Sequence, residues 1–257
     1  MSDWNPEQYL KFGSERTRPS IDLMARIGIE RAESILDVGC GPGNSTQVLR
    51  LRWPRAEITG LDNSTKMIEE ARKNYPGGKW VIGDASKLEG EGAYDIVFSN
   101  AALQWIPGHS ILIPRLFSLV RPGGAMAAQV PANSGSPLHR GLLSVSRKAQ
   151  WRALTAGCRH LLHYHSPEYY YDLLQPLAAK VDLWETTYYH VLSSHKELIE
   201  WYKGSGMRPF LERLPDDSAA SAFENEVLER CKRFYPSRKD GEVLYPFRRV
   251  FFIAYAA

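Results

Sequence analysis

Short apolar runs alternate with amphipathic stretches through the first half of the chain. Helical spacing of apolar positions predicts helices over residues 44–52, 64–73 and 111–119. The apolar runs predict five strands, over residues 34–38, 57–62, 79–83, 94–99 and 125–130. This strand-then-helix rhythm is typical of an α/β fold with a mostly parallel sheet and helices on both faces.

The second half breaks this rhythm. Helices are expected over residues 138–162 and 167–175, a β-rich alternation predicts a sixth strand over 181–192, and 247–255 forms a last, strongly apolar strand. Residues 194–235 read as helical, with breaks at residues 204–206 and at Pro215. A helical insertion placed there lies above the carboxyl edge of the sheet, where open α/β sheets bind ligands.

These patterns predict four segments. They are an N-terminal helical lid (1–30), a Rossmann-like core (31–192), a helical substrate cap (193–242) and a final strand that completes the sheet (243–257). A chain of 257 residues is long enough for one large domain with such an insertion.

Composition narrows the partners. A net charge of +3 is too small for a nucleic-acid-binding surface but fits a local basic site for an acidic small molecule. Three widely spaced cysteines encode neither a disulfide framework nor a zinc site, and we expect no metal. The start of the chain lacks a signal-peptide pattern, and the longest apolar stretch is too short to span a membrane. We expect a cytoplasmic monomer or homodimer.

A glycine loop follows the first predicted strand. Glycines at this place let the backbone turn sharply and approach a ligand without a Cβ in the way. Asp37, Gly39, Gly41 and Gly43 form the pattern D-x-G-x-G-x-G, whereas a dinucleotide fingerprint needs glycine at the position of Asn44. The pattern resembles the first motif of class I S-adenosylmethionine-dependent methyltransferases.

Three later strand ends fit the same cofactor. Asp62 follows Gly43 by about 20 residues, where a carboxylate can accept both ribose hydroxyl protons. Asp84 is placed to accept from the adenine amino group, and Asn100 lies beside the reacting sulfonium. The resemblance implies that S-adenosyl-L-methionine is bound by Tyr9, Asp37, Gly39, Gly41, Gly43, Asp62, Asn63, Met67, Asp84, Ala85, Asn100 and Trp105.

The resemblance extends to one family within this superfamily. Blocks at 4–12, 15–19, 41–46, 100–107, 186–190 and 206–211 look like those of the trans-aconitate methyltransferases. This similarity implies a Rossmann-like domain capped by a helical insertion. It also implies methyl transfer to one carboxylate of trans-aconitate, which yields a monomethyl ester and S-adenosylhomocysteine.

A trianionic substrate needs cations, and the fork of an arginine pairs with a carboxylate through two hydrogen bonds. Arg248 and Arg249 are adjacent in a predicted strand, so they point to opposite faces and only one can face a shared site. Arg16 and Arg208 lie inside the family-like blocks. We therefore predict a substrate site formed by Arg16, Tyr188, His190 and Arg208, with Arg18, Arg248, Arg249 and Tyr189 as weaker candidates.

A carboxylate substrate also predicts what the chemistry lacks. A carboxyl group with a pKa near 4 is already ionised at neutral pH, so it attacks a sulfonium methyl without a general base. The enzyme acts by positioning and by excluding water. His109 and His190 are then structural or substrate-orienting, and Tyr9, Phe12 and Trp105 can screen the sulfonium with their aromatic faces.

One loop departs from the family pattern. Residues 131–139 lack the two acidic positions that the relatives carry after the fifth strand, and residues 151–165 are unusually basic. The acceptor can therefore differ from trans-aconitate while remaining a carboxylate.

Three alternatives stay open at this point. The first is another small-molecule O- or C-methyltransferase of the ubiquinone or biotin-pathway type. The second is a nicotinamide-dependent oxidoreductase, which the asparagine at position 44 argues against. The third is a non-catalytic module that binds S-adenosylmethionine for a partner.

Overall fold

The computed structural model describes residues 11–257, which divide into two compact units. The Rossmann unit contains the described residues up to 131 together with 163–186 and 249–257, and the helical unit contains 132–162 and 187–248. This division places residues 132–162 together with the residues of the predicted cap. Two long strands, β6 (Lys180–Leu192) and β7 (Val243–Tyr255), contribute residues to both units.

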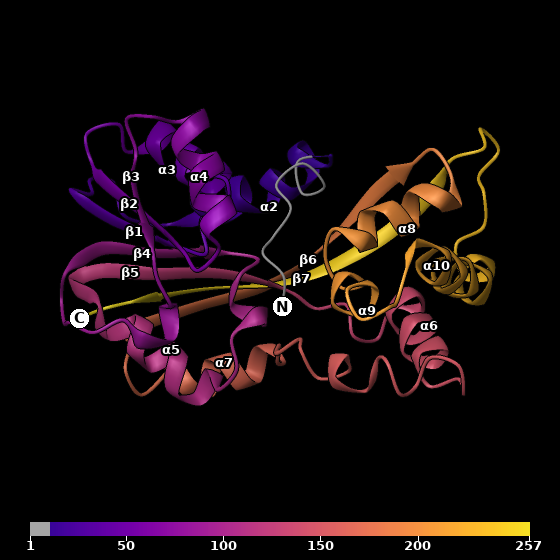
Figure 1. Ribbon diagram of the computed structural model, residues 1–257. Helices are drawn as coiled ribbons and strands as arrows, with labels where there is room; N and C mark the ends of the chain where they lie inside the picture. The colour runs from indigo at the N-terminus through magenta and orange to yellow at the C-terminus, as the bar shows by residue number, and fades with distance from the viewer. Residues whose placement is uncertain (1–10) are drawn as a thin grey trace. The chain divides into compact units, whose positions relative to one another are not determined.

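One seven-stranded sheet has the order β3-β2-β1-β4-β5-β7-β6 (Figure 1). Its first five strands pair in parallel, and β7 is antiparallel to β5. The fold class predicted from the sequence is therefore confirmed, with helices between the last two strands in chain order. The five strands are β1 (Ser34–Val38), β2 (Glu57–Asp62), β3 (Lys79–Ile82), β4 (Tyr94–Asn100) and β5 (Val120–Pro131).

The centre of the sheet is β1, which pairs with β2 on one side and with β4 on the other. It is short and apolar, and four of its five residues are buried, as expected for a parallel strand covered on both faces. From β1 the chain continues outward to β2 and β3, then returns to β4 on the other side of β1 and continues outward to β5. The order of strands therefore reverses between β1 and β4. In open α/β sheets such a switch point marks the ligand-binding edge.

Helices cover both faces of the Rossmann unit. They are α2 (Gly13–Arg26), α3 (Asn44–Arg52), α4 (Thr65–Asn74), α5 (His109–Ser118) and α7 (Pro167–Leu174). Helix α2 packs against α3 and β5, and α5 packs against β5 and α7. Ser64 caps the start of α4, because its side chain accepts a hydrogen bond from the Met67 amide at 3.2 Å.

The helical unit contains α6 (Pro137–Ser146), α8 (His195–Lys203), α9 (Arg208–Leu211) and α10 (Asp217–Cys231). The interruptions between α8, α9 and α10 fall at the breaks predicted from the sequence. Short 3-10 turns complete the two units, at Ala85–Lys87, Leu103–Trp105, Ala156–Cys158 and Lys232–Phe234. Among residues 11–257 we find no helix with the length and apolar character needed to traverse a bilayer.

The helix predicted over residues 138–162 is wrong beyond Ser146, where α6 ends. The Ser146 carbonyl, which a continuing helix would give to residue 150, instead accepts from Thr155 Oγ1 at 2.9 Å and from Arg159 Nη2 at 2.7 Å. Trp151 donates through Nε1 to Glu226 of α10 at 2.9 Å. These longer-range contacts outweigh the local helical pattern.

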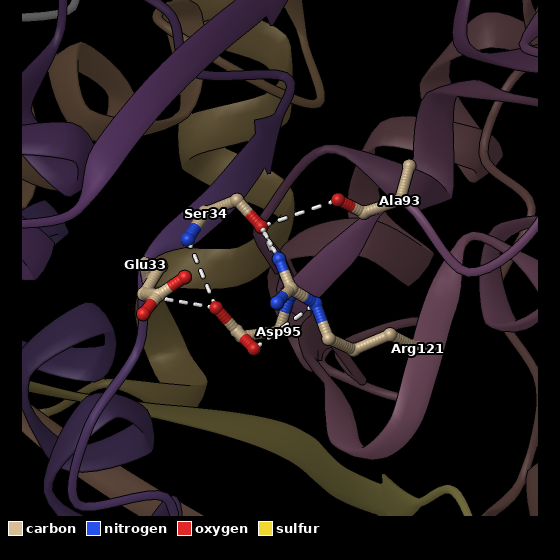
Figure 2. A network of polar contacts seen from close by, with 5 residues as sticks. All are labelled: Glu33, Ser34, Ala93, Asp95 and Arg121. Carbon is tan, nitrogen blue, oxygen red and sulfur yellow. Dashed lines mark hydrogen bonds and ion pairs between the residues drawn. The ribbon is translucent and has the colours of Figure 1, made fainter.

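The opposite edge of the sheet, at the amino ends of β1 and β4, is fastened by Asp95. One oxygen of its carboxylate accepts from the amides of Glu33 at 2.6 Å and Ser34 at 2.9 Å, and the other lies 3.1 Å from Arg121 Nε (Figure 2). Arg121 also donates to the Ser34 hydroxyl, which donates to the Ala93 carbonyl at 3.2 Å. This network joins three strands at the edge away from the glycine loop.

We predict that Asp95→Ala lowers the free energy of unfolding by about 1.5–3 kcal/mol, because two amides lose a charged acceptor. Arg121→Ala removes a partly exposed ion pair and the hydrogen bond to the Ser34 hydroxyl, and it should cost less, about 1 kcal/mol. Urea melts of the two variants measure the difference. Equal losses of stability in the two variants would show that the contacts of Arg121, and not the hydrogen bonds from the two backbone amides, stabilise this edge.

Candidate functional site

The carboxyl ends of β1, β2 and β4 meet at one edge of the Rossmann unit, since the three strands are parallel neighbours. The glycine loop leaves β1 at this edge. Asp62 and Asn100 are the last residues of β2 and β4.

The glycine loop turns with positive φ at all three predicted glycines, at +72°, +55° and +96° for Gly39, Gly41 and Gly43. The Gly39 amide donates to the Leu61 carbonyl of β2 at 2.7 Å. A Cβ on Gly39 would lie 2.1 Å from the Ala102 Cβ, in the segment after β4. Glycine at position 39 is therefore required both by its φ and by this close approach.

Asp37 supports the loop from inside. Its carboxylate is fully buried and accepts from Ser45 Oγ at 2.6 Å and Thr46 Oγ1 at 2.7 Å, both in the first turn of α3. Burial raises the pKa of Asp37 to about 6, and the two hydroxyl bonds act in the opposite direction. Asp37, a predicted cofactor residue, therefore lies in the buried interior beneath the glycine loop, where it contacts the start of α3.

Asp62 joins the loop to the next helix. One carboxylate oxygen accepts from the Gly41 amide at 2.9 Å and the other accepts from the Ser64 amide at 2.9 Å. Asn63, beside it, is exposed, and Met67 is buried. A carboxylate held in this way has a fixed orientation at the end of β2.

Asp84 follows β3 and caps the short turn that begins at Ala85. Its Oδ1 accepts from the Ser86 hydroxyl at 2.7 Å and from the Ser86 amide at 2.9 Å, and these bonds lower the pKa of Asp84. Asp84 is exposed and ionised at neutral pH, while Ala85 beside it is buried.

The end of β4 carries the most constrained backbone of the site. Ala101 has a φ of +55°, which no other non-glycine residue among those described shares. Before it, Asn100 is buried, and its Nδ2 donates to the Arg16 carbonyl at 3.5 Å. Its Oδ1 is buried without a hydrogen-bond donor among residues 11–257. Trp105, half-buried, closes the following turn.

Of the predicted cofactor residues, those from Asp37 to Trp105 all belong to the Rossmann unit. They come from the carboxyl ends of its strands or from the segments that follow them. Tyr9 lies outside the described residues, and the predicted aromatic neighbour Phe12 is buried.

The predicted substrate residues are divided between the units. Arg16 belongs to the Rossmann unit, whereas Tyr188, His190 and Arg208 belong to the helical unit. Tyr188 and His190 are buried on one face of β6, and Tyr189 between them is exposed.

Both His190 and Arg208 have defined surroundings within the helical unit. The His190 ring lies 4.1 Å from that of Trp201, measured between ring centroids, and is also close to the rings of Tyr245 and Phe247. Arg208 Nε lies 3.6 Å from Glu212 Oε1, one helical turn further on.

His109 has a structural environment. Its Nε2 lies 2.9 Å from the Leu103 carbonyl, which can only accept, so Nε2 carries the proton and Nδ1 accepts from the Tyr170 hydroxyl at 3.0 Å. Burial lowers the pKa of His109, which favours this neutral form. Both ring nitrogens are thus committed to the fold.

Of two further polar residues at this edge, the sequence offered Arg249 only as a weaker candidate and did not point to Gln129. Arg249 Nη1 donates to Gln129 Oε1 at 2.7 Å, and both side chains are buried. The neighbouring Arg248 is exposed, which confirms that the two adjacent arginines point to opposite faces. A glutamine inside the apolar run 125–130 was the available signal for Gln129.

Comparison with known proteins identifies the family. A profile described as "Methyltransferase domain" matches residues 35–124. Trans-aconitate 2-methyltransferases from Methylobacterium radiotolerans and Escherichia coli O157:H7 are each 41% identical, and the one from Variovorax paradoxus is 42% identical. Each alignment covers 99% of this chain and 98% of the relative. The chain belongs to the trans-aconitate 2-methyltransferase family. The resemblance read from the sequence blocks is confirmed.

Solved structures agree on the fold of this trans-aconitate 2-methyltransferase family member. A phosphoethanolamine N-methyltransferase 2 from Haemonchus contortus, in complex with S-adenosyl-L-methionine, superposes with a TM-score of 0.57 at 14% identity, over 93% of this chain and 53% of that one. The YcgJ protein from Bacillus subtilis gives 0.59 at 12% identity, over 93% and 98%. At these identities the likeness concerns the fold alone.

We predict that Gly39→Ala destabilises the protein more than Gly41→Ala does. Both positions have positive φ, which costs a residue with a Cβ about 1–2 kcal/mol. Only at Gly39 does the added Cβ overlap Ala102, because nothing lies within 4 Å of a Cβ at Gly41. The overlap adds roughly 1–3 kcal/mol.

Denaturant unfolding of the two variants measures this difference in the free energy of unfolding. A second substitution, Ala102→Gly, should recover part of the loss in Gly39→Ala and none in Gly41→Ala. Equal destabilisation of the two single variants would contradict a tight contact between the loops after β1 and β4.

Proposed function

We propose that this chain transfers a methyl group from S-adenosylmethionine to a carboxylate of trans-aconitate, forming a monomethyl ester and S-adenosylhomocysteine. The observation that carries the proposal is the family relationship, at 41% identity over 98% of a relative's length. Buried polar groups at the carboxyl edge of the sheet are consistent with it.

The residues at the carboxyl edge fit such a cofactor. Gly39 and Gly41, with the Asn100 segment, would hold the methionine part, and the buried Oδ1 of Asn100 would accept from its amino group. Asp62 would accept from the ribose hydroxyls, since a carboxylate accepts about four hydrogen bonds and two amides already orient this one.

The remaining predicted residues surround the adenine and the sulfonium. Asp84 and Ala85 would contact the adenine. Asn63, Met67, Trp105 and Tyr9 complete the proposed cofactor set, and Asp37 acts through the loop that it supports.

S-adenosylmethionine supplies a methyl group activated by a positively charged sulfur. The protein's task is to hold an ionised carboxylate in line with that methyl and to exclude water. No general base is needed, and His109 is engaged in the fold through both ring nitrogens. We keep Arg16, Tyr188, His190 and Arg208 as proposed substrate residues.

We expect a small-molecule carboxylate as the partner, with neither nucleic acid nor membrane involved. We also expect a cytoplasmic monomer or homodimer.

A methyl-transfer assay tests the acceptor. Purified protein with labelled S-adenosylmethionine is expected to methylate trans-aconitate, with the ester identified by mass, at a rate that changes little between pH 6.5 and 8.5 because the acceptor is ionised throughout. Phenols and carbon acids serve as controls and should react poorly. Methylation of a phenol in preference to trans-aconitate, with a rate that rises with pH, would replace this proposal with a base-dependent methyltransferase.

Substitution of Asp62 tests the cofactor site. Asp62→Ala is expected to weaken S-adenosylhomocysteine binding by about 1–3 kcal/mol in calorimetry, because the ribose hydroxyls and two backbone amides lose their acceptor. Asp172→Ala, an exposed carboxylate on α7, is the matched control and should bind normally. Unchanged affinity in Asp62→Ala would remove Asp62 from the site.

A further inference from the structure

We propose that Arg249, oriented by Gln129, binds a carboxylate of the acceptor that is not methylated, and so selects tricarboxylates over dicarboxylates. This inference rests on the proposed function. It deepens that function by assigning a specificity-determining role to Arg249, which the sequence offered only as a weaker candidate, and an orienting role to Gln129.

The sheet register places the residues of this site side by side. Asn100 of β4 pairs with Gln129 of β5, and Gln129 pairs with Phe251 of β7. Paired residues point to the same face, and so do residues two apart in a strand, so Arg249 shares the face of Gln129 and Asn100. We call Asn100, Gln129 and Arg249 the polar row. It crosses the carboxyl edge of the Rossmann unit.

Helix α2 covers the same face. The Arg16 carbonyl accepts from Asn100 Nδ2 at 3.5 Å, and Arg26 lies over the ring of Trp184, which stacks on Phe251. The polar row is thus overlaid by the helix that carries Arg16, a proposed substrate residue. Buried polar groups in such a place call for a polar ligand.

The chemistry of the Arg249 contact fixes the orientation of the Gln129 amide. A guanidinium can only donate, so the atom that faces Arg249 at 2.7 Å is the oxygen of Gln129, and its Nε2 points elsewhere. That Nε2 is buried in a fully buried residue and has no acceptor among residues 11–257. A buried donor of this kind indicates an acceptor supplied by a ligand.

A carboxylate can accept from both groups. The guanidinium presents five N–H donors in a rigid fork that matches two carboxylate oxygens, and the bond to Gln129 fixes the plane of that fork. The Gln129 amide adds a neutral donor beside the cation. This combination binds an anion and offers nothing to an apolar or cationic group.

The position indicates a carboxylate other than the reacting one. In the proposed function Asn100 lies near the methyl group, and β7 is two strands away, at about 10 Å. The Arg249 side chain spans part of this distance toward Gln129. An anchor there binds one end of a small acid while another carboxylate reaches the methyl, and it leaves that reacting oxygen without a strong ion pair.

Arg249→Met tests the proposal. We expect kcat/KM for trans-aconitate to fall about 10–100-fold, the range for loss of a charge-assisted hydrogen-bonded pair, while S-adenosylhomocysteine affinity stays within threefold. Three dicarboxylates, mesaconate, itaconate and cis-glutaconate, each lack a different carboxylate of trans-aconitate. For the one that lacks the carboxylate bound by Arg249, the substitution should change kcat/KM less than threefold.

Two further variants keep the test decisive. Arg248→Met, at the exposed neighbour, is the matched control and should behave as wild type. Gln129→Glu keeps the size of the side chain but puts a carboxylate against the guanidinium, so it should compete with the substrate and give the same selective loss even if Arg249→Met does not fold.

The outcomes separate the two proposals. An equal fall on trans-aconitate and on all dicarboxylates that react, in both Arg249→Met and Gln129→Glu, would show that the Arg249–Gln129 pair is structural and would overturn the inference. A wild-type protein that binds S-adenosylhomocysteine but methylates none of these acids would instead overturn the proposed function, and the inference with it.

Discussion

The rest of the site depends on one close approach, between the loop after β1 and the segment after β4. Gly39 lies so near Ala102 that even a methyl group cannot be inserted, and the next residue back, Ala101, accepts an unfavourable φ. These two segments flank the switch point of the sheet. Asn100 and the glycine loop are therefore held beside each other by the backbone itself, before any side chain contributes.

Around this contact the polar groups form two sets. Asp37 and Asp62 both hold the glycine loop in place. Asp37 does so from the buried interior, through two hydroxyl donors, and Asp62 does so from the end of β2, through the Gly41 amide. Asn100, Gln129 and Arg249 continue across the neighbouring strands. The first set explains how a segment rich in glycine, which has many accessible backbone conformations, adopts one defined turn. The second set holds the Arg249 guanidinium in an orientation fixed by Gln129, at the edge where we propose that the acceptor binds.

Most of the fold follows from the sequence, because short apolar runs and glycine stops report directly on parallel strands. The failures have a common physical cause. The end of α6 at Ser146 is decided by Thr155, Arg159 and the contact of Trp151 with α10, none of which is local. Gln129 and its contact with Arg249 became visible only when the β5–β7 register was known, since the two residues are 120 positions apart in the sequence. Strand ends such as Asp62 and Asn100 were predictable because parallel topology alone brings them together.

The two hydrogen bonds that backbone amides donate to Asp62 have a consequence for the kinetics of ligand binding. They are made by the protein's own backbone, so the carboxylate already occupies one orientation when a nucleoside arrives. Little conformational entropy then has to be lost on association. A site that is already oriented in this way favours fast association. Differences in affinity between related ligands should then appear mainly in their dissociation rates.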